Sequence, residues 1–202
     1  MKPSQRRFIS VLFCIFASYL CMINISVIMA QEFPKVESKY WTSKYDSYFR
    51  KYSKRFFGVG FDWKWFKAQA IAESGLREDA KSWANAKGLM QIIPRTFEEI
   101  KKKNPSFIDI NEPRWNIAAG VYYDHQQYRR WKNLSFEHRM RFTFASYNAG
   151  YSTIRRAQNV SKKEGFGGDA WEHIESVAQK VSRWRYKETL GYVGKITNIM
   201  PE

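Results

Sequence analysis

The sequence predicts a mainly α-helical domain that follows an N-terminal export segment. Apolar residues recur at three- and four-residue steps through most of the chain, which is the period of a helix buried along one face. Aspartate, serine and proline stand where such segments begin, and glycines stand where they end. No convincing run alternates apolar and polar residues as a half-buried strand does. A chain of 202 residues that is 44% hydrophobic has enough apolar material for a core.

The N-terminus has the layout of a secretory signal. Lys2, Arg6 and Arg7 precede an uncharged apolar run from Phe8 to Ala30, which is long enough to span a bilayer. We expect residues 1–30 to be a signal peptide or an uncleaved anchor, residues 31–38 a linker, and residues 39–202 the exported domain. The domain would then lie in the periplasm, either soluble or held at the inner membrane through residues 8–30.

The first predicted helix starts near Tyr40 and carries an apolar stripe on one face, made of Trp41, Tyr45, Tyr48, Phe49 and Tyr52. Gly58 and Gly60 interrupt it. Asp62 is a plausible N-cap for a second helix, which includes Phe66 and Glu73 and ends at Gly75. A loop of small and polar residues then continues to about Lys87.

Further helices are predicted over about 94–103, 112–131, 135–150, 170–182 and 185–199. Ser135 is the expected cap of the third of these, and Gly150 the expected end. Asp169 with Glu172 resembles a capping box for the fourth.

Composition narrows the class of partner and site. There are 34 Lys and Arg residues against 19 Asp and Glu, a net charge of +15 that favours anionic partners. No nucleic-acid-binding motif accompanies this charge, so nucleic acid is not the expected partner. Both cysteines, Cys14 and Cys21, lie in the apolar run, and the three histidines lack metal-ligand spacing. We therefore expect neither a disulfide framework nor a metal site.

Glu73 is the first candidate for chemistry. It follows Phe66 by seven residues, so the two project from nearly the same helix face. Desolvation on a core-facing surface raises the pKa of a carboxyl group and keeps it protonated near neutral pH, as a general acid must be. Taken alone, Glu73 is better explained as an ordinary surface or salt-bridged glutamate.

A second candidate segment contains Ser82 and the run from Gly88 to Thr96. Gly88 permits close approach of a ligand to the backbone. Gln91 can donate to and accept from sugar hydroxyl and N-acetyl groups, and Met90 offers a soft apolar wall for a sugar face. Alone, the segment is also explained as a loop bounded by glycine and proline, with Met90 filling the core.

A third candidate segment runs from Ala145 to Gly150 and places Tyr147 beside Asn148 at a helix end. It also reads as an ordinary helix C-terminus, with Asn148 or Gly150 in the left-handed conformation.

Together these segments resemble the lytic transglycosylase family, whose catalytic domain is goose-lysozyme-like. The motifs that carry the resemblance cover about residues 60–196, and they are Glu73-Ser74, Ser82, Gly88-Leu89-Met90-Gln91, Pro94, Thr96, Asn116-Ile117, Gly120, Tyr147-Asn148-Ala149-Gly150 and Glu188-Thr189-Leu190-Gly191-Tyr192-Val193. Each motif is moderately specific, and their order and spacing together are very specific. The resemblance implies a lysozyme-like helical fold.

The resemblance also implies an activity. Members of this family cleave the β-1,4 bond between N-acetylmuramic acid and N-acetylglucosamine in peptidoglycan and leave 1,6-anhydro ends, without a metal or cofactor. Glu73 would be the catalytic acid. The substrate-binding residues would be Ser82, Met90, Gln91, Tyr147, Asn148 and Tyr192.

Four positions depart from the family pattern and bear on substrate preference: Leu76 replaces an aromatic residue, Glu78 a proline, Asn85 a glycine and Ser146 an alanine. Two alternatives stay open. A goose-type muramidase would hydrolyse the same bond with water, for which Asp62 or Asp79 would be the second acid. A peptidoglycan-binding module without activity would have no need of Glu73.

Overall fold

The computed structural model describes residues 41–200, which belong to one compact unit. Their eight α-helices are α2 (Asp46–Phe57), α3 (Lys64–Ser74), α4 (Pro94–Lys103), α5 (Pro113–Arg130), α6 (Phe136–Ala149), α7 (Tyr151–Lys163), α8 (Trp171–Val177) and α9 (Tyr186–Ile199). Short 3-10 turns, η2 (Ser43–Tyr45) and η3 (Ala178–Lys180), precede α2 and follow α8. The predicted mainly α-helical class is confirmed.

Three elements differ from the prediction. The first helix starts at Asp46 and not near Tyr40, so Trp41 lies before it and is not part of its apolar stripe. Helix α7 was not predicted, because it follows α6 without a loop, and Gly150 ends one helix and caps the next with φ of +84°. Helix α8 is shorter than the expected 170–182, since it ends at Val177 and continues as a 3-10 turn. Its N-cap position is Ala170, so Asp169 and Glu172 do not form the expected box; Asp169 lies instead 3.4 Å from Nδ1 of His173.

The expected helix ends are largely present. Asp62 accepts a hydrogen bond from the Lys64 backbone N–H at 3.0 Å, although Trp63 occupies the N-cap position of α3. Ser135 is the N-cap of α6 without a side-chain hydrogen bond. Gly75 ends α3 in the left-handed conformation, as glycine does readily.

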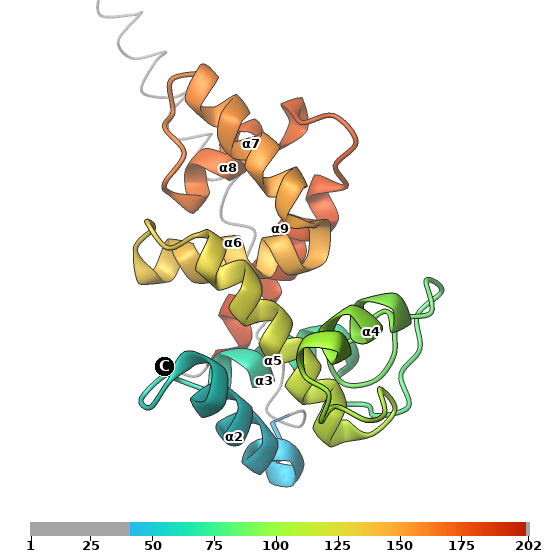
Figure 1. The fold of residues 1–202 in the computed structure, drawn as a ribbon. Coiled ribbons are helices and arrows are strands. Elements are labelled where there is room, and N and C mark those ends of the chain that lie inside the picture. The colour runs from blue at the N-terminus through green and yellow to red at the C-terminus, as the bar shows by residue number, and fades with distance from the viewer. Residues whose placement is uncertain (1–40, 201–202) are drawn as a thin grey trace, which may run out of the picture. The chain divides into compact units, whose positions relative to one another are not determined.

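Helix α3 lies between two apolar clusters and buries both of its sides. Phe66 and Ala70 pack into one cluster with residues of α2, α4 and α5. Ala68 and Ile71 pack into the other with residues of α6 to α9. Figure 1 shows α3 and the long helix α5 in the middle of the drawn helices, with α2 and α4 on one side and α7 and α8 on the other. The C-terminal end of α3 therefore lies where the two clusters meet.

A partly buried ion pair attaches the start of the domain to α3. Lys67 is almost fully buried, and its ammonium lies 2.6 Å from the carboxylate of Asp46 and 4.5 Å from the centre of the Trp41 ring. Removing Asp46 would leave the charge of Lys67 buried and unpaired, which typically costs about 3–5 kcal/mol. This contact fixes α2 and the residues before it against the helix that carries Glu73.

No helix within residues 41–200 is both long and apolar enough to cross a bilayer. The predicted export segment, residues 1–30, and the predicted linker, residues 31–38, lie outside the described residues.

Candidate active site

Glu73 lies in the last turn of α3 and is held there by α9. Oε1 of Glu73 accepts a 2.6 Å hydrogen bond from the hydroxyl of Tyr192. Three residues further along α9, the Lys195 ammonium donates to the backbone carbonyl of Ala72 at 2.9 Å. These two contacts fix the carboxyl group against α9 while the Glu73 side chain keeps part of its surface exposed.

The pKa of Glu73 is raised to about 7. Desolvation by the surrounding protein is the main cause, because it disfavours the ionised form. The hydrogen bond from Tyr192 and the positive charge of Lys195 lower the pKa, and they offset only part of the desolvation. Near neutral pH the group is therefore close to half protonated and can both give and take a proton.

Ser74 joins α3 to the loop over residues 75–93. Its hydroxyl lies 2.9 Å from the carbonyl of Leu89 and 3.2 Å from that of Ala70. One hydroxyl hydrogen shared between these acceptors keeps the loop against the end of the helix. The Glu-Ser pair thus combines the acid with the residue that positions the neighbouring loop.

Asn116, near the start of α5, holds the same loop from the other side. Its side-chain oxygen accepts from the Met90 backbone N–H at 2.8 Å, and its amide nitrogen donates to the carbonyls of Lys87 and Ile110. A Cβ at Gly88, where φ is +73°, would lie 2.5 Å from this amide nitrogen. The loop conformation therefore needs glycine at position 88.

Ser82 and Gln91 are both partly exposed, and both bond to the loop itself. The Ser82 hydroxyl oxygen accepts from the Ala86 backbone N–H at 3.0 Å, closing a turn in which Asn85 has φ of +62°. The amide nitrogen of Gln91 donates to the carbonyls of Ala80 and Gly88 at 3.2 and 2.9 Å. Asn85 thus supplies the positive φ for which the family pattern has glycine.

Met90 does not form the expected apolar wall. Its side chain is fully buried, and a Cβ at Gly120 of α5 would lie 2.7 Å from it, so the thioether fills the core. Its backbone carbonyl instead accepts a 2.7 Å hydrogen bond from the hydroxyl of Tyr147 on α6. The pKa of Tyr147 is raised, first by burial and then by the charge of Glu73. Tyr147 and Glu73 therefore lie close enough to interact electrostatically.

Asn148 connects α6 to α9. Its exposed side chain accepts a 2.8 Å hydrogen bond from the hydroxyl of Thr189, which itself accepts from the indole N–H of Trp184 at 3.0 Å. Asn148 is still within α6, and the positive φ of the expected helix end belongs to Gly150.

Two carboxyl groups considered as a second acid lie apart from these contacts. Asp62 pairs with Lys64 at the start of α3, and Asp79 is exposed. Neither contributes to the pKa shift of Glu73. Asp124 of α5 is a different case, because the charge of Glu73 is one cause of the raised pKa of Asp124.

Asp124 was missed by the sequence reasoning. It is fully buried, its pKa is raised well above the usual range by desolvation, and Nε2 of Gln69 donates to its Oδ1 at 3.3 Å. Its other oxygen lacks a hydrogen-bond partner among the described residues, as do the side-chain oxygens of Gln69 and Gln127. The signal was present, since Asp124 follows buried Ile117 by the same seven residues that separate Glu73 from Phe66.

The structure thus brings the half-protonated carboxyl group of Glu73 together with a hydrogen-bond donor, Tyr192. Beside them lies the loop over residues 75–93, which Ser74 and Asn116 hold in place and which we call the braced loop. Such an arrangement suits proton transfer to and from a bound substrate.

Comparisons with known proteins agree with this geometry. A family model described as "Transglycosylase SLT domain" matches residues 47–167. The chain is 32% identical over 136 residues to the membrane-bound lytic murein transglycosylase F of Desulfosudis oleivorans, covering 66% of this chain and 29% of that protein. The protein of the same name from Shewanella pealeana is 27% identical over 150 residues, covering 74% of this chain and 29% of that one. The chain thus spans less than a third of the length of these relatives.

Solved structures show the same fold. The 70 kDa soluble lytic transglycosylase of Escherichia coli superposes with a TM-score of 0.56 at 26% identity, covering 77% of this chain and 23% of that chain. A lytic transglycosylase of Pseudomonas aeruginosa, solved as an inactive mutant, gives a TM-score of 0.61 at 19% identity and covers 94% of this chain and 28% of that chain. The expected lysozyme-like helical fold is confirmed by these neighbours.

Proposed function

The chain belongs to the family of the transglycosylase SLT domain, and we propose that it is a lytic transglycosylase of peptidoglycan. It would cleave the β-1,4 bond between N-acetylmuramic acid and N-acetylglucosamine and leave 1,6-anhydro-muramyl ends. The observation that carries this proposal is a partly exposed Glu73 with a pKa of about 7, bonded to Tyr192 and joined through Ser74 to a braced loop.

The first step needs an acid. Protonated Glu73 would donate to the glycosidic oxygen as the bond to the muramic acid C1 breaks, and the N-acetyl group of the same sugar would stabilise the cation that develops. A pKa of about 7 keeps a large fraction of Glu73 protonated at neutral pH, unlike an ordinary glutamate.

The second step needs a base. Glu73 is ionised after the first step, and it would take the proton from the C6 hydroxyl of the muramic acid while that oxygen attacks C1 and closes the anhydro ring. The nucleophile is part of the substrate, so the reaction gains the advantage of an intramolecular attack and consumes no water. The hydrogen bond from Tyr192 stabilises the ionised form between the two steps.

The remaining site residues would hold the glycan strand. The partly exposed side chains of Ser82 and Gln91 lie on the braced loop, and Asn148 is exposed at the end of α6. Tyr147 and Tyr192 would position the loop carbonyl and the acid. Met90 would take part through its backbone, because its side chain is buried.

The protein would act outside the cytoplasm. The basic start and apolar run of residues 1–30 support export to the periplasm, as a soluble or inner-membrane-anchored protein. A membrane-impermeant labelling reagent applied to intact cells should reach the domain. Labelling only after the cytoplasm is opened would contradict this location.

The activity is tested with purified peptidoglycan sacculi. The protein should release soluble glycan fragments, and Glu73→Gln should not, because a neutral amide of nearly the same shape cannot act as a general acid. Circular dichroism would establish that the variant is folded. A folded Glu73→Gln variant that releases fragments at the normal rate would refute the assignment.

A further inference from the structure

Helix α2, at the lower edge of the drawn helices in Figure 1, carries only positive charge on its solvent face. Every exposed side chain of this helix except that of Ser47 is a cation. We call these cations the basic face: Arg50, Lys51, Lys54 and Arg55. The acid of the helix, Asp46, is paired with Lys67 of α3. No cation of the basic face lies within 4.0 Å of a carboxylate among residues 41–200.

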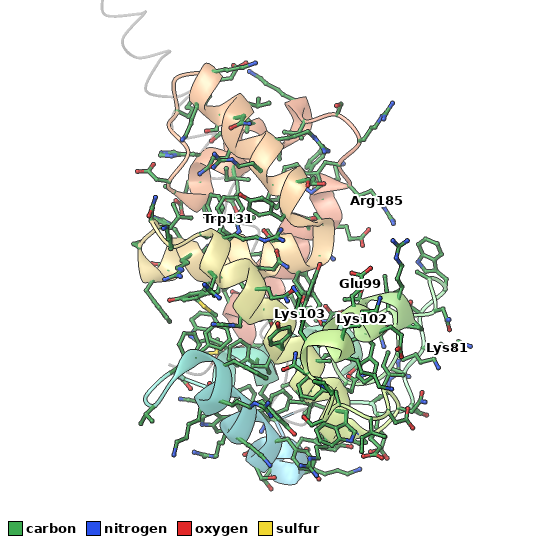
Figure 2. The ribbon with its side chains drawn as sticks, in the orientation of Figure 1. Lys81, Glu99, Lys102, Lys103, Trp131 and Arg185 are labelled. Atoms are coloured by element: carbon green, nitrogen blue, oxygen red, sulfur yellow. The ribbon has the colours of Figure 1, made fainter. Side chains whose placement is uncertain are left out.

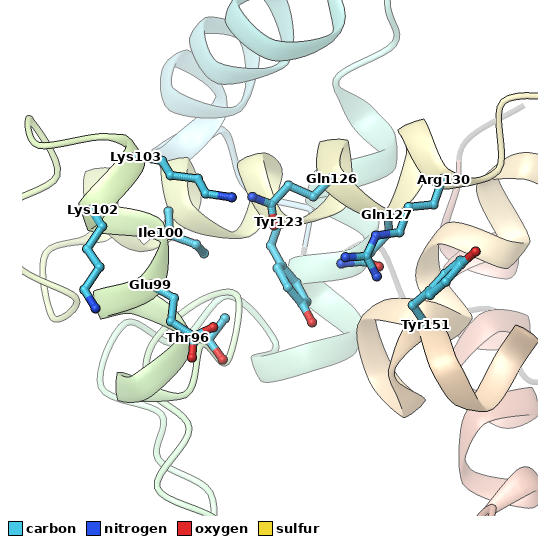
Figure 3. Close-up of a pocket in the computed structure, with 10 residues that line it drawn as sticks. All are labelled: Thr96, Glu99, Ile100, Lys102, Lys103, Tyr123, Gln126, Gln127, Arg130 and Tyr151. Carbon is cyan, nitrogen blue, oxygen red and sulfur yellow. The ribbon is translucent and has the colours of Figure 1, made fainter.

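Other parts of the surface mix the two signs of charge. Figure 2 shows Glu99 together with Lys102 and Lys103 on α4. Figure 3 shows the same three residues at a cleft between α4, α5 and the first residue of α7. That cleft adjoins the candidate active site, because the Tyr123 ring in its wall lies 5.2 Å from the Tyr147 ring, centre to centre. The basic face of α2 differs from it both in its lack of acids and in its place on the molecule.

The basic face opposes the stability of the helix that carries it. Arg50 precedes Lys54 by four residues and Lys51 precedes Arg55 by four, so each pair of like charges lies together on the helix surface and repels. Lys54 and Arg55 stand in the last turn, where the helix dipole favours cations, but Arg50 and Lys51 stand one turn earlier. An anionic surface laid against this face would relieve the repulsion.

The loop after α2 places an apolar side chain in solvent beside the basic face. Val59 is 86% exposed and stands between Gly58 and Gly60, which have φ of +98° and +90°. Phe57 and Phe61 fix the base of this loop, because their ring centres lie 4.4 Å apart. A single exposed valine is ordinary, but this one stands at the tip of a fixed loop next to unpaired cations. We call residues 58–60 the Val59 loop.

A hollow of about 400 Å³ lies between the basic face and the Val59 loop. Arg50 and Lys54 line it from α2, and Trp63 lines it from the start of α3. The guanidinium of Arg50 lies 4.2 Å from the centre of the Trp63 ring, which orients the planar group. Asp62, the acid in the wall, is paired with Lys64 at 3.6 Å. An oriented guanidinium can donate two parallel hydrogen bonds to a phosphate group in such a hollow.

We propose that the basic face and the Val59 loop dock on the phosphate headgroups of an anionic lipid bilayer. The cations would lie against the headgroups, with one phosphate in the hollow, and Val59 would enter the boundary between headgroups and acyl chains. Docking of this kind combines electrostatic attraction with a small buried apolar area. The docking surface shares no residue with the candidate active site, so the inference stands apart from the proposed function.

The place of α2 in the chain favours a bilayer over other anionic partners. Only residues 31–45 separate α2 from the apolar run that we expect to be a signal peptide or an anchor. If the run stayed as an anchor, α2 would lie within about 50 Å of the bilayer, since an extended chain spans at most about 3.3–3.6 Å per residue. An anchor limits the distance of a domain from the bilayer, whereas a docking surface also sets its orientation.

The test measures individual lysines in the full chain. The protein is reconstituted into vesicles of phosphatidylcholine alone, or of phosphatidylcholine mixed with phosphatidylglycerol. A water-soluble acylating reagent then labels accessible lysines, and mass spectrometry compares Lys51 and Lys54 with Lys162 and Lys163 in the same molecules. The last two are exposed on α7, outside the docking surface, so they correct for how the protein is oriented in the vesicles.

In the anionic vesicles, labelling of Lys51 and Lys54 relative to the reference lysines should fall about three- to tenfold. In neutral vesicles the ratio should equal that in detergent. Added salt should restore labelling in the anionic vesicles, because salt screens exposed charges. Equal ratios in both kinds of vesicle would overturn the proposal. So would protection of these lysines by peptidoglycan sacculi but not by anionic vesicles, because the partner of the basic face would then be a polymer.

Val59→Asp tests the apolar part of the docking surface. A carboxylate at the loop tip would have to leave water and approach anionic headgroups, so the protection of Lys51 and Lys54 should fall by at least about threefold. The matched control is Phe166→Asp, because Phe166 is also exposed between two glycines of positive φ. Circular dichroism would establish that both variants are folded. Protection that is as strong in Val59→Asp as in Phe166→Asp would contradict insertion of the Val59 loop.

Discussion

Glu73 and Asp124 are two desolvated carboxyl groups in one domain, and their surroundings differ. Glu73 ends α3, keeps part of its surface exposed, and accepts a hydrogen bond from Tyr192 with Lys195 nearby. Asp124 is fully enclosed on α5, and within residues 41–200 its side chain accepts a hydrogen bond only from the amide of Gln69. Burial raises the pKa of both groups.

The difference indicates why Glu73, and not Asp124, is suited to the role of catalytic acid that we propose: both groups are desolvated, so burial alone does not distinguish them. The hydrogen bond and positive charge at Glu73 bring its pKa back to about 7, where both protonation states are populated. Asp124 has no cationic partner among residues 41–200, so desolvation favours its neutral form, and it has no exposed surface through which to meet a substrate. The candidate site therefore differs from the core in two respects: its carboxyl group is accessible, and a hydrogen-bond donor favours the ionised form of that group.

The sharpest contrast should come from replacing each acid with its amide. Glu73→Gln should lower turnover by at least about a thousandfold, because both proton transfers depend on this group. Asp124→Asn should stay within about twofold of wild type, because asparagine keeps the shape of the side chain and desolvation already favours the uncharged form of Asp124. Turnover of sacculi under identical conditions checks both. Comparable losses of turnover in the two variants would contradict the claim that Glu73 belongs to the active site and Asp124 to the core.

The comparison also extends to stability. An acid whose pKa is raised on folding stabilises the protein most at pH values below its unfolded pKa, and that contribution is lost as pH rises through the folded value. For Glu73 the window runs from about 4.5 to about 7 and corresponds to about 3 kcal/mol. Glu73→Gln should therefore be more stable than wild type at pH 8 and should show a flatter pH dependence. Urea unfolding of both proteins between pH 4 and pH 8 measures the free energy of unfolding. If this free energy depended on pH in the same way in wild type and variant, the raised pKa would be contradicted.

Asp124→Asn should likewise stabilise the protein at neutral pH. Desolvation disfavours the charge of Asp124 in the wild type, whereas asparagine carries none and offers an N–H to the oxygens of Gln69 or Gln127, which lack a hydrogen-bond partner within residues 41–200. We expect a gain of about 1 kcal/mol or more, seen as a higher urea midpoint at pH 7. A less stable Asp124→Asn would mean that Asp124 is ionised in the folded protein.

Tyr192→Phe probes what distinguishes Glu73 from Asp124. Loss of the hydroxyl removes a hydrogen bond that lowers the pKa of Glu73, so that pKa should rise above about 7. Turnover should fall about tenfold at neutral pH, since a hydrogen bond to a charged group is typically worth about 1.5–3 kcal/mol. The pH–rate profile should move to higher pH. An unshifted profile would show that Tyr192 has only a packing role.

The smallest effects should come from the braced loop and its neighbour. Gln91→Ala and Tyr147→Phe each remove neutral hydrogen bonds worth about 0.5–1.5 kcal/mol, so turnover should fall by about two- to tenfold. Kinetics of both variants that match wild type would mean that these residues serve the fold alone.

Much of the site could be predicted because its signals are local. The seven-residue spacing of Phe66 and Glu73 predicted a desolvated carboxyl group, with which the raised pKa of Glu73 agrees, and the motifs in order predicted the other residues that we propose for the site. Contacts between distant segments could not be predicted in this way. Met90 looked available to a ligand because its burial depends on Gly120, and the bracing of its loop depends on Asn116.

Two other misses have physical reasons. Helix α7 was overlooked because Gly150 serves both as the end of one helix and as the start of the next. Asp124 was overlooked because an aspartate is normally exposed, although its spacing from Ile117 placed it on the buried face of α5.

The central claim, that Glu73 acts alone as acid and base, is tested most directly by the ends that cleavage leaves. Mass spectrometry of digested peptidoglycan, before and after borohydride treatment, separates the two outcomes. If the C6 hydroxyl attacks, the new muramyl ends are anhydro sugars, lighter than hydrolysed ends by one water and resistant to reduction. Predominantly reducible ends would contradict the account, because a second carboxylate would then have to position water.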